Sequence, residues 1–185
     1  MRNICSKFIF KKSMKKFISF FVVAAISFSA MTSIAQDKSK RPSPPASVTA
    51  TTSKGVTINI NYSQPSVKGR TIGKEIATFG ELWRTGANEA TVFEVNKEVT
   101  VGGKKIKAGK YGLYSIPGAK EWTIILNNKS NLWGADNYSQ SEDAVRLVTP
   151  AGKSKSFMEK MTILISDAGK VSLIWGDTMV DFSVQ

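Results

Sequence analysis

Apolar and polar side chains alternate strictly in the stretch Val56-Thr57-Ile58-Asn59-Ile60-Asn61-Tyr62. A period of two places all the apolar residues on one face of an extended chain, which can lie on a core while the polar face meets water. An amphipathic helix would instead repeat its apolar residues every three or four positions. The stretch therefore predicts a half-buried β-strand.

The same period returns in three later stretches, at 161–165, 171–175 and 180–184. Turn sequences such as Gly102-Gly103 and Pro117-Gly118 punctuate the chain at short intervals. Nine or ten short strands separated by such turns are typical of antiparallel sandwiches and barrels. We expect an all-β fold: a single antiparallel β-sandwich or jelly-roll-like domain, following a cleaved signal peptide.

Two long stretches, 63–88 and 127–143, break the alternation. Short helical turns are expected within or beside them, at 75–83 and 141–145. Long irregular connections are uncommon in compact domains and often carry function, so these stretches are where a site is expected. Trp122 and Trp175 lie within strand patterns instead and are expected in the core.

The N-terminal residues have the three parts of a secretory signal. Residues 1–16 contain six basic residues and no acidic one, residues 17–31 are mostly apolar, and Ser33-Ile34-Ala35 offers small residues at a cleavage site. The apolar run is shorter than the ~20 residues that span a bilayer. We predict a signal peptide at 1–35, a flexible Pro/Ser/Lys-rich segment at 36–46 and the β-sandwich at 47–185. The protein is then exported to the periplasm or the extracellular space, with no membrane span in the mature chain.

Charge and composition exclude several classes of function. The chain has 26 basic and 14 acidic residues, but six basic residues lie in the predicted leader, so the mature part carries +6 rather than +12. Its Lys and Arg residues are scattered, apart from the group at 104–110, and nucleic acid is not an expected partner.

There is no histidine, and the one cysteine, Cys5, lies in the leader. Triad hydrolysis, thiolate chemistry and His or Cys metal sites are thus excluded for the mature chain. We predict no cofactor, no metal site and no catalytic residues. The enzyme alternative is a carboxylate-dependent hydrolase of envelope or extracellular glycans, in which Glu89 pairs with Asp136 or Glu81.

The candidate ligand site starts from Trp83, Arg84, Asn88 and Glu89, which place an aromatic ring, a guanidinium, an amide and a carboxylate within seven residues. Arginine can grip a carboxylate or phosphate through its planar fork. The purely structural alternative is equally concrete: Arg84 and Glu89 pair to fasten a long loop, while Trp83 fills the core. The sequence leaves both readings open.

A second group, Trp133, Asn137 and Tyr138, poses the same choice between an exposed platform for a glycan and a buried loop anchor. With the first group, it predicts a non-enzymatic module that recognises a small polar ligand, glycan or peptide. The hydrolase and a purely structural envelope module are the alternatives.

Four runs of the sequence stand out together: Tyr62-Ser-Gln-Pro-Ser-Val-Lys-Gly-Arg70, Trp83-Arg-Thr-Gly-Ala-Asn-Glu-Ala-Thr91, Ala108-Gly-Lys-Tyr-Gly-Leu-Tyr-Ser-Ile-Pro-Gly118, and Trp133-Gly134 followed by Asn137-Tyr138. In this order they resemble the bacterial secreted family catalogued as domain of unknown function 2911. The resemblance covers about residues 44–185. It implies a secreted or periplasmic protein and carries no established activity.

We predict that export of the full-length chain by a bacterial host yields a mature protein beginning at Gln36. Ser33 and Ala35 supply the small residues that signal peptidase reads, and Gln36 opens a polar segment. Intact-mass analysis of the exported protein measures this directly. Recovery of the uncleaved chain in the membrane fraction would contradict it.

Overall fold

The computed structural model describes residues 37–185, so the predicted signal peptide and cleavage site lie outside the described residues. Residues 38–185 form one compact unit. Its strands are β1 (Pro45–Thr51), β2 (Thr57–Ser63), β3 (Thr91–Val95), β4 (Val99–Val101), β5 (Lys104–Ile106), β6 (Gly109–Ile116), β7 (Glu121–Asn127), β8 (Asp143–Ile165) and β9 (Lys170–Ser183). Two short 3-10 turns complete it, η1 (Lys38–Lys40) and η2 (Gln140–Glu142). No helix in the described part of the chain is long and apolar enough to cross a membrane.

One of the two expected helical turns is absent. Within 75–83 the structure has turns and bends instead of a helix. The backbone is left-handed at Ala77 (φ 47°) and at Gly80 (φ 81°), which is incompatible with a right-handed helix. The other expected turn, at 141–145, is present only in part: η2 ends at Glu142, and residues 143–145 already belong to β8.

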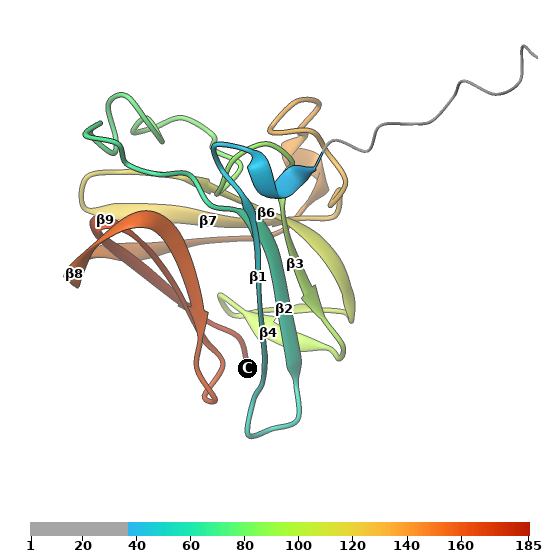
Figure 1. Ribbon diagram of the computed structural model, residues 1–185. Coiled ribbons are helices and arrows are strands. Elements are labelled where there is room, and N and C mark those ends of the chain that lie inside the picture. The colour runs from blue at the N-terminus through green and yellow to red at the C-terminus, as the bar shows by residue number, and fades with distance from the viewer. Residues whose placement is uncertain (1–36) are drawn as a thin grey trace, which may run out of the picture. The chain divides into compact units, whose positions relative to one another are not determined.

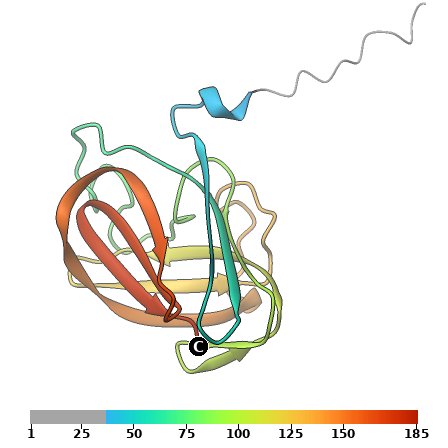
Figure 2. The same cartoon turned by 60° about the horizontal axis from the view of Figure 1, so that its bottom comes forward.

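Seven strands form a single antiparallel sheet in the order β1-β2-β3-β6-β7-β8-β9. The long strand β8 pairs with β7 through residues 143–150 and with β9 through 151–165, so it turns a corner between the two partners. Figures 1 and 2 show the result: β1 and β2 run across the direction of β7, and the β8–β9 hairpin curls over the enclosed space. The curled antiparallel sheet confirms the predicted sandwich-like, all-β fold.

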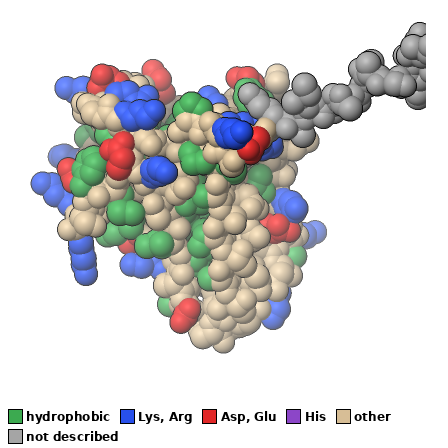
Figure 3. Space-filling model, viewed as in Figure 1, with side chains coloured by type: hydrophobic (Ala, Val, Ile, Leu, Met, Phe, Trp, Pro, Cys, Tyr) green, Lys and Arg blue, Asp and Glu red, His purple; other side chains and the backbone are tan. Residues whose placement is uncertain are grey.

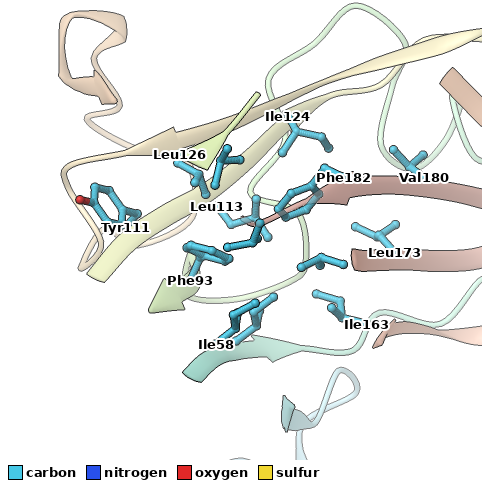
Figure 4. Close-up of a cluster of buried hydrophobic side chains, with 14 of the residues drawn as sticks. Ile58, Phe93, Tyr111, Leu113, Ile124, Leu126, Ile163, Leu173, Val180 and Phe182 are labelled. Carbon is cyan, nitrogen blue, oxygen red and sulfur yellow. The ribbon is translucent and has the colours of Figure 1, made fainter. Parts of the chain in front are cut away.

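The enclosed face of the sheet holds the main core, and the alternation seen in the sequence sets which residues enter it. Ile58 and Ile60 are fully buried, and so are Met161 and Phe93. Figure 4 shows apolar side chains from opposite walls of the curled sheet, such as Ile58 and Phe182, converging on one another. Trp122 and Trp175 are 1% and 2% exposed, which confirms their predicted place in the core.

The outer face of the sheet carries a second, smaller core. Tyr114 and Ile125 are cross-strand partners on β6 and β7 that point away from the main core, and both are fully buried. They are covered by apolar residues of the two long irregular segments, Leu82, Leu132, Ala135 and Tyr138. An outer face of this kind could not stay apolar without such a cover. The long segments are therefore held down on the sheet.

Backbone contacts outside the main ladder close the curled sheet. Residues following β2 reach β8, where Met161 N donates to Pro65 O at 2.9 Å and Val67 N donates to Glu159 O at 2.8 Å. At the C-terminus, Val184 N donates to Gly169 O at 2.9 Å in the β8–β9 turn. These bonds tie elements that are distant in sequence.

The turn at Gly169 gives a stability prediction with an internal control. Gly169 and Gly103 share φ of 79°, but a Cβ on Gly169 would overlap the Val184 carbonyl oxygen, whereas a Cβ on Gly103 has nothing within 4 Å. Gly103→Ala should lower the free energy of unfolding by about 1–2 kcal/mol, because alanine disfavours the left-handed backbone. Gly169→Ala should cost about 1–3 kcal/mol more, as overpacking does. Chemical denaturation measures both, and equal losses would contradict the packing role of Gly169.

Candidate functional site

The two long irregular segments meet at one end of the domain (Figure 1). Glu89 and Trp133 form an antiparallel bridge, and Ala90 N donates to Leu132 O at 3.1 Å. The structure thus brings both predicted residue groups together, although 44 positions of sequence separate these bridge partners. Their individual side chains do very different things.

Trp83 belongs to the main core. Its ring stacks on Trp175 with centroids 5.4 Å apart and an interplanar angle of 11°, and it meets Trp122 edge-on at 6.0 Å. Its Nε1 donates to Gly86 O at 3.1 Å within its own loop. The packing therefore supports the structural alternative for Trp83, in which its ring fills the core.

The loop that follows Trp83 is tightly fastened although it has no regular structure. Thr85 is fully buried with φ of 50°, a strained conformation for a β-branched residue. Its hydroxyl donates to Ser115 Oγ at 2.9 Å, and Thr91 Oγ1 donates to Thr85 O at 2.7 Å. These buried bonds offset the strain and fix the positions of the residues on either side.

Arg84 does not pair with Glu89, so the ion pair of the structural alternative is wrong. Arg84 Nη1 donates to Asn88 O at 3.0 Å, and the guanidinium lies against Gly134 of the other segment. A Cβ on Gly134 would lie 2.9 Å from Arg84 Cζ, and the backbone there has φ of 64°. Both facts favour glycine at that position.

Glu89 is neutralised from the N-terminal segment instead. Arg41 Nη1 lies 3.0 Å from each Glu89 carboxylate oxygen, and Lys38 Nζ is 2.9 Å from Oε1. Asn88 Nδ2 also donates to Ser43 O at 3.1 Å. Acidic and basic side chains lie side by side where the described chain begins (Figure 3). Part of the segment predicted as flexible is thus fastened to the loop.

The pKa of Glu89 falls from 4.5 to about 2. Partial burial is the largest single influence and raises the pKa. It is outweighed by the combined hydrogen bonds from the Glu89 backbone, Lys38 and Arg41, together with the Lys38 charge. Glu89 is therefore an anion at any ordinary pH.

A groove of about 380 Å³ lies beside Glu89, on the outer face of β1, β2 and β3. Ser47, Asn61 and Val92 are cross-strand neighbours on that face and form part of its lining. Its lining also includes the small residues Ala46, Ser63 and Ala90, together with Lys38 and Glu89.

The second predicted group divides into exposed and anchoring residues. Trp133 is 57% exposed, and Asn137 is exposed with a left-handed backbone. Tyr138 is half-buried and packs edge-on against Tyr114, with ring centroids 5.2 Å apart. Only Trp133 offers a large aromatic surface to a ligand.

Tyr138 is held by a polar network rather than presented to solvent. Its hydroxyl donates to Asp143 Oδ2 at 2.7 Å, and Arg146 Nη1 bonds to the same oxygen at 2.7 Å. Asn127 Nδ2 donates to Asp143 Oδ1 at 2.7 Å. Burial raises the pKa of Tyr138, and the neighbouring Asp143 carboxylate raises it further. This network anchors the 128–142 segment on the sheet.

A family model described as "Protein of unknown function (DUF2911)" matches residues 43–184. The chain belongs to this family. The match confirms the resemblance seen in the sequence, and it contains the strands of the groove and both irregular segments. No curated protein and no solved structure matches the chain.

Sequence reasoning does not find several residues that lie at this site. Lys38 and Arg41 were assigned to the flexible segment, and Ser47 and Asn61 were assigned only to strands. Asn61 is one of the polar residues that alternate with apolar ones in β2, so the sequence does place it on the outer face. No signal in the sequence links Lys38 or Arg41 to Glu89, 48 residues beyond Arg41.

The lowered pKa of Glu89 predicts an acid-dependent loss of stability. A carboxylate whose pKa falls on folding contributes stability that is fully present above the unfolded value of about 4.5. That contribution is lost as the pH falls toward about 2. Glu89→Gln should therefore flatten the fall in unfolding free energy between pH 5 and 2, measured by chemical denaturation.

Glu98→Gln is the matched control, because Glu98 pairs with Lys105 at 3.5 Å between two largely exposed side chains. Such exposed pairs contribute little to stability, so this variant should retain the wild-type acid dependence. Parallel curves for Glu89→Gln and wild type would show that the Lys38–Glu89–Arg41 cluster does not stabilise the fold.

Proposed function

We propose that this domain is an exported, non-enzymatic module that binds a small saccharide in the groove beside Glu89. The observation that carries the proposal is the 380 Å³ groove over three strands, with Glu89 at its wall and the exposed Trp133 bridged to Glu89. Its volume falls within the range of small-molecule sites. The domain lies at the envelope or outside the cell, as the predicted signal peptide requires.

The polar groups in the groove favour an uncharged ligand that carries hydroxyl groups. Ser47, Asn61 and Ser63 offer hydroxyl and amide groups that can both donate and accept hydrogen bonds to sugar hydroxyls. Trp133 is not part of the groove lining, but it is exposed and bridged to Glu89, so its ring can pack against a sugar ring that extends out of the groove. Glu89 is fixed as an anion by its two cations, so it serves as an oriented acceptor.

The same ion pairs argue against hydrolysis at Glu89. A glycosidase acid needs a carboxyl whose pKa is raised so that it carries a proton near neutral pH. The pKa of Glu89 moves the other way, to about 2. A carboxylate with so low a pKa is also a weak base. Binding is thus better supported than catalysis.

We expect a saccharide panel to raise the melting temperature of the processed protein, because a ligand that binds only the native state stabilises it. Trp133 fluorescence should report the same event, since Trp122 and Trp175 are buried and Trp83 is stacked in the core. Trp133→Ala should abolish the shift, yet change stability by only about 0.5 kcal/mol, as exposed substitutions do.

Phe157→Ala is the matched control, because Phe157 is a similarly exposed aromatic (55%) on β8. It should leave the melting shift unchanged. Ser47→Trp gives a second test, since the large ring would fill the groove from an exposed strand position. The proposal is wrong if no saccharide stabilises the wild type, or if binding survives both Trp133→Ala and Ser47→Trp.

A further inference from the structure

Arg84 is a half-buried cation without an acidic partner. Within residues 37–185, its side chain forms no ion pair, and its one hydrogen bond runs from Nη1 to Asn88 O at 3.0 Å. A guanidinium carries five N–H donors, so most of its capacity is unused. Removing such a charge from water is costly unless it is paired, which makes an unpaired Arg84 unexpected in a purely structural role.

The bridge between Trp83 and Ser115 places Arg84 near Tyr114. Trp83 and Ser115 bridge two chain segments through mutual backbone bonds of 2.8 and 2.9 Å. In an antiparallel bridge the next residue of one segment faces the preceding residue of the other, with both side chains on the same face. Trp83 enters the main core, so Arg84 and Tyr114 share the outer face.

The Tyr114 hydroxyl is itself unsatisfied. Tyr114 is fully buried, and its Oη makes no hydrogen bond to any protein group of residues 37–185. Burial raises the pKa of this phenol, and the Arg84 charge opposes that rise, which places the two groups within electrostatic reach. A buried hydroxyl without a partner costs stability and calls for an explanation.

We infer that Arg84 and Tyr114 form a binding site for a small oxyanion, with a carboxylate as the best-fitting ligand. Both side chains offer donors, and the one acceptor bonded to either of them among residues 37–185 is the Asn88 carbonyl, so an acceptor with negative charge would complement the pair. The planar guanidinium matches the two oxygens of a carboxylate. The Gly134 backbone lies against the guanidinium.

Access comes from the Arg84 side, because Arg84 is partly exposed and Tyr114 is not. Because Tyr114 Oη is buried, our inference requires the Arg84 side chain, which is held by one hydrogen bond to Asn88 O, to move outward and let the anion reach the hydroxyl. Ala90 packs with Tyr114 and also lines the groove, so the two sites are neighbours. The anion site nevertheless stands without saccharide binding in the groove.

The test measures thermal stability of the processed protein in acetate, phosphate or chloride at equal ionic strength and pH 7. Acetate should raise the melting temperature above chloride in a saturable way, and phosphate reports whether the site takes any oxyanion. Arg84→Lys keeps the charge but loses the fork, so it should weaken anion binding by at least about tenfold. Arg70→Lys is the control, because within residues 37–185 that guanidinium bonds only the Ser66 and Val67 carbonyls, and this variant should bind anions as wild type does.

Tyr114→Phe separates a ligand group from a structural one. Without anion, the variant should be at least as stable as wild type, because it removes an unsatisfied hydroxyl. Its anion affinity should nevertheless fall severalfold. Tyr111→Phe should do the reverse, losing stability because Tyr111 Oη bonds Lys107 O at 2.9 Å, and keeping anion affinity.

The inference is overturned if neither oxyanion stabilises the wild type beyond chloride, or if the stabilisation persists in Arg84→Lys. It is also overturned if Tyr114→Phe binds anions as tightly as wild type. The anion result and the saccharide result are independent. Anion binding without saccharide binding would support this site and contradict the proposed function. Saccharide binding without anion binding would support the proposed function and contradict this site.

Discussion

The stacking of Trp83 on Trp175 is the contact on which the candidate site depends. It fixes one end of a loop to the main core, and the Trp83–Ser115 bridge then sets which face each following residue occupies. Arg84 is turned to the outer face, and the buried Thr85 reverses the chain with a left-handed backbone. Aromatic pairs stabilise a fold by more than the apolar area they bury, so the Trp83 ring can hold a strained loop in place. The position of Arg84 on the outer face therefore depends on the stacking of Trp83 on Trp175 in the core.

Charge neutralisation from the N-terminal segment is the second constraint. Glu89 lies between Lys38 and Arg41, so residues that precede the first strand are part of the site's electrostatics. The arrangement leaves a net positive charge around one carboxylate. Meanwhile Arg84, five residues away, has no acidic partner among residues 37–185. The loop therefore carries one paired anion and one cation without an acidic partner among the described residues, so its two ends differ in chemistry.

Backbone strain gathers in the same two segments. Thr85, Asn88 and Asn137 all have positive φ, and Gly134 adopts a left-handed backbone under Arg84. Residues held in such conformations persist only where surrounding contacts over-determine them, and they cluster at ligand sites. Here the contacts are the buried Thr85–Ser115 bond and the network around Asp143. A rigid, strained pair of loops is consistent with recognition by a preformed surface.

Much of the fold could be predicted from the sequence, because a period of two is a local property that the pleated backbone converts directly into buried and exposed faces. Neighbouring residues alone were enough to predict the strand that contains Ile58 and Ile60. They were also enough to predict the position of both irregular segments. The tertiary structure alone decided the partner of each site residue. Glu89 is bound by Arg41 rather than Arg84, Trp83 is in the core, and Trp133 is exposed. These outcomes depend on how the sheet curls and which loops cover its outer face, and such long-range packing leaves no periodic trace in the sequence.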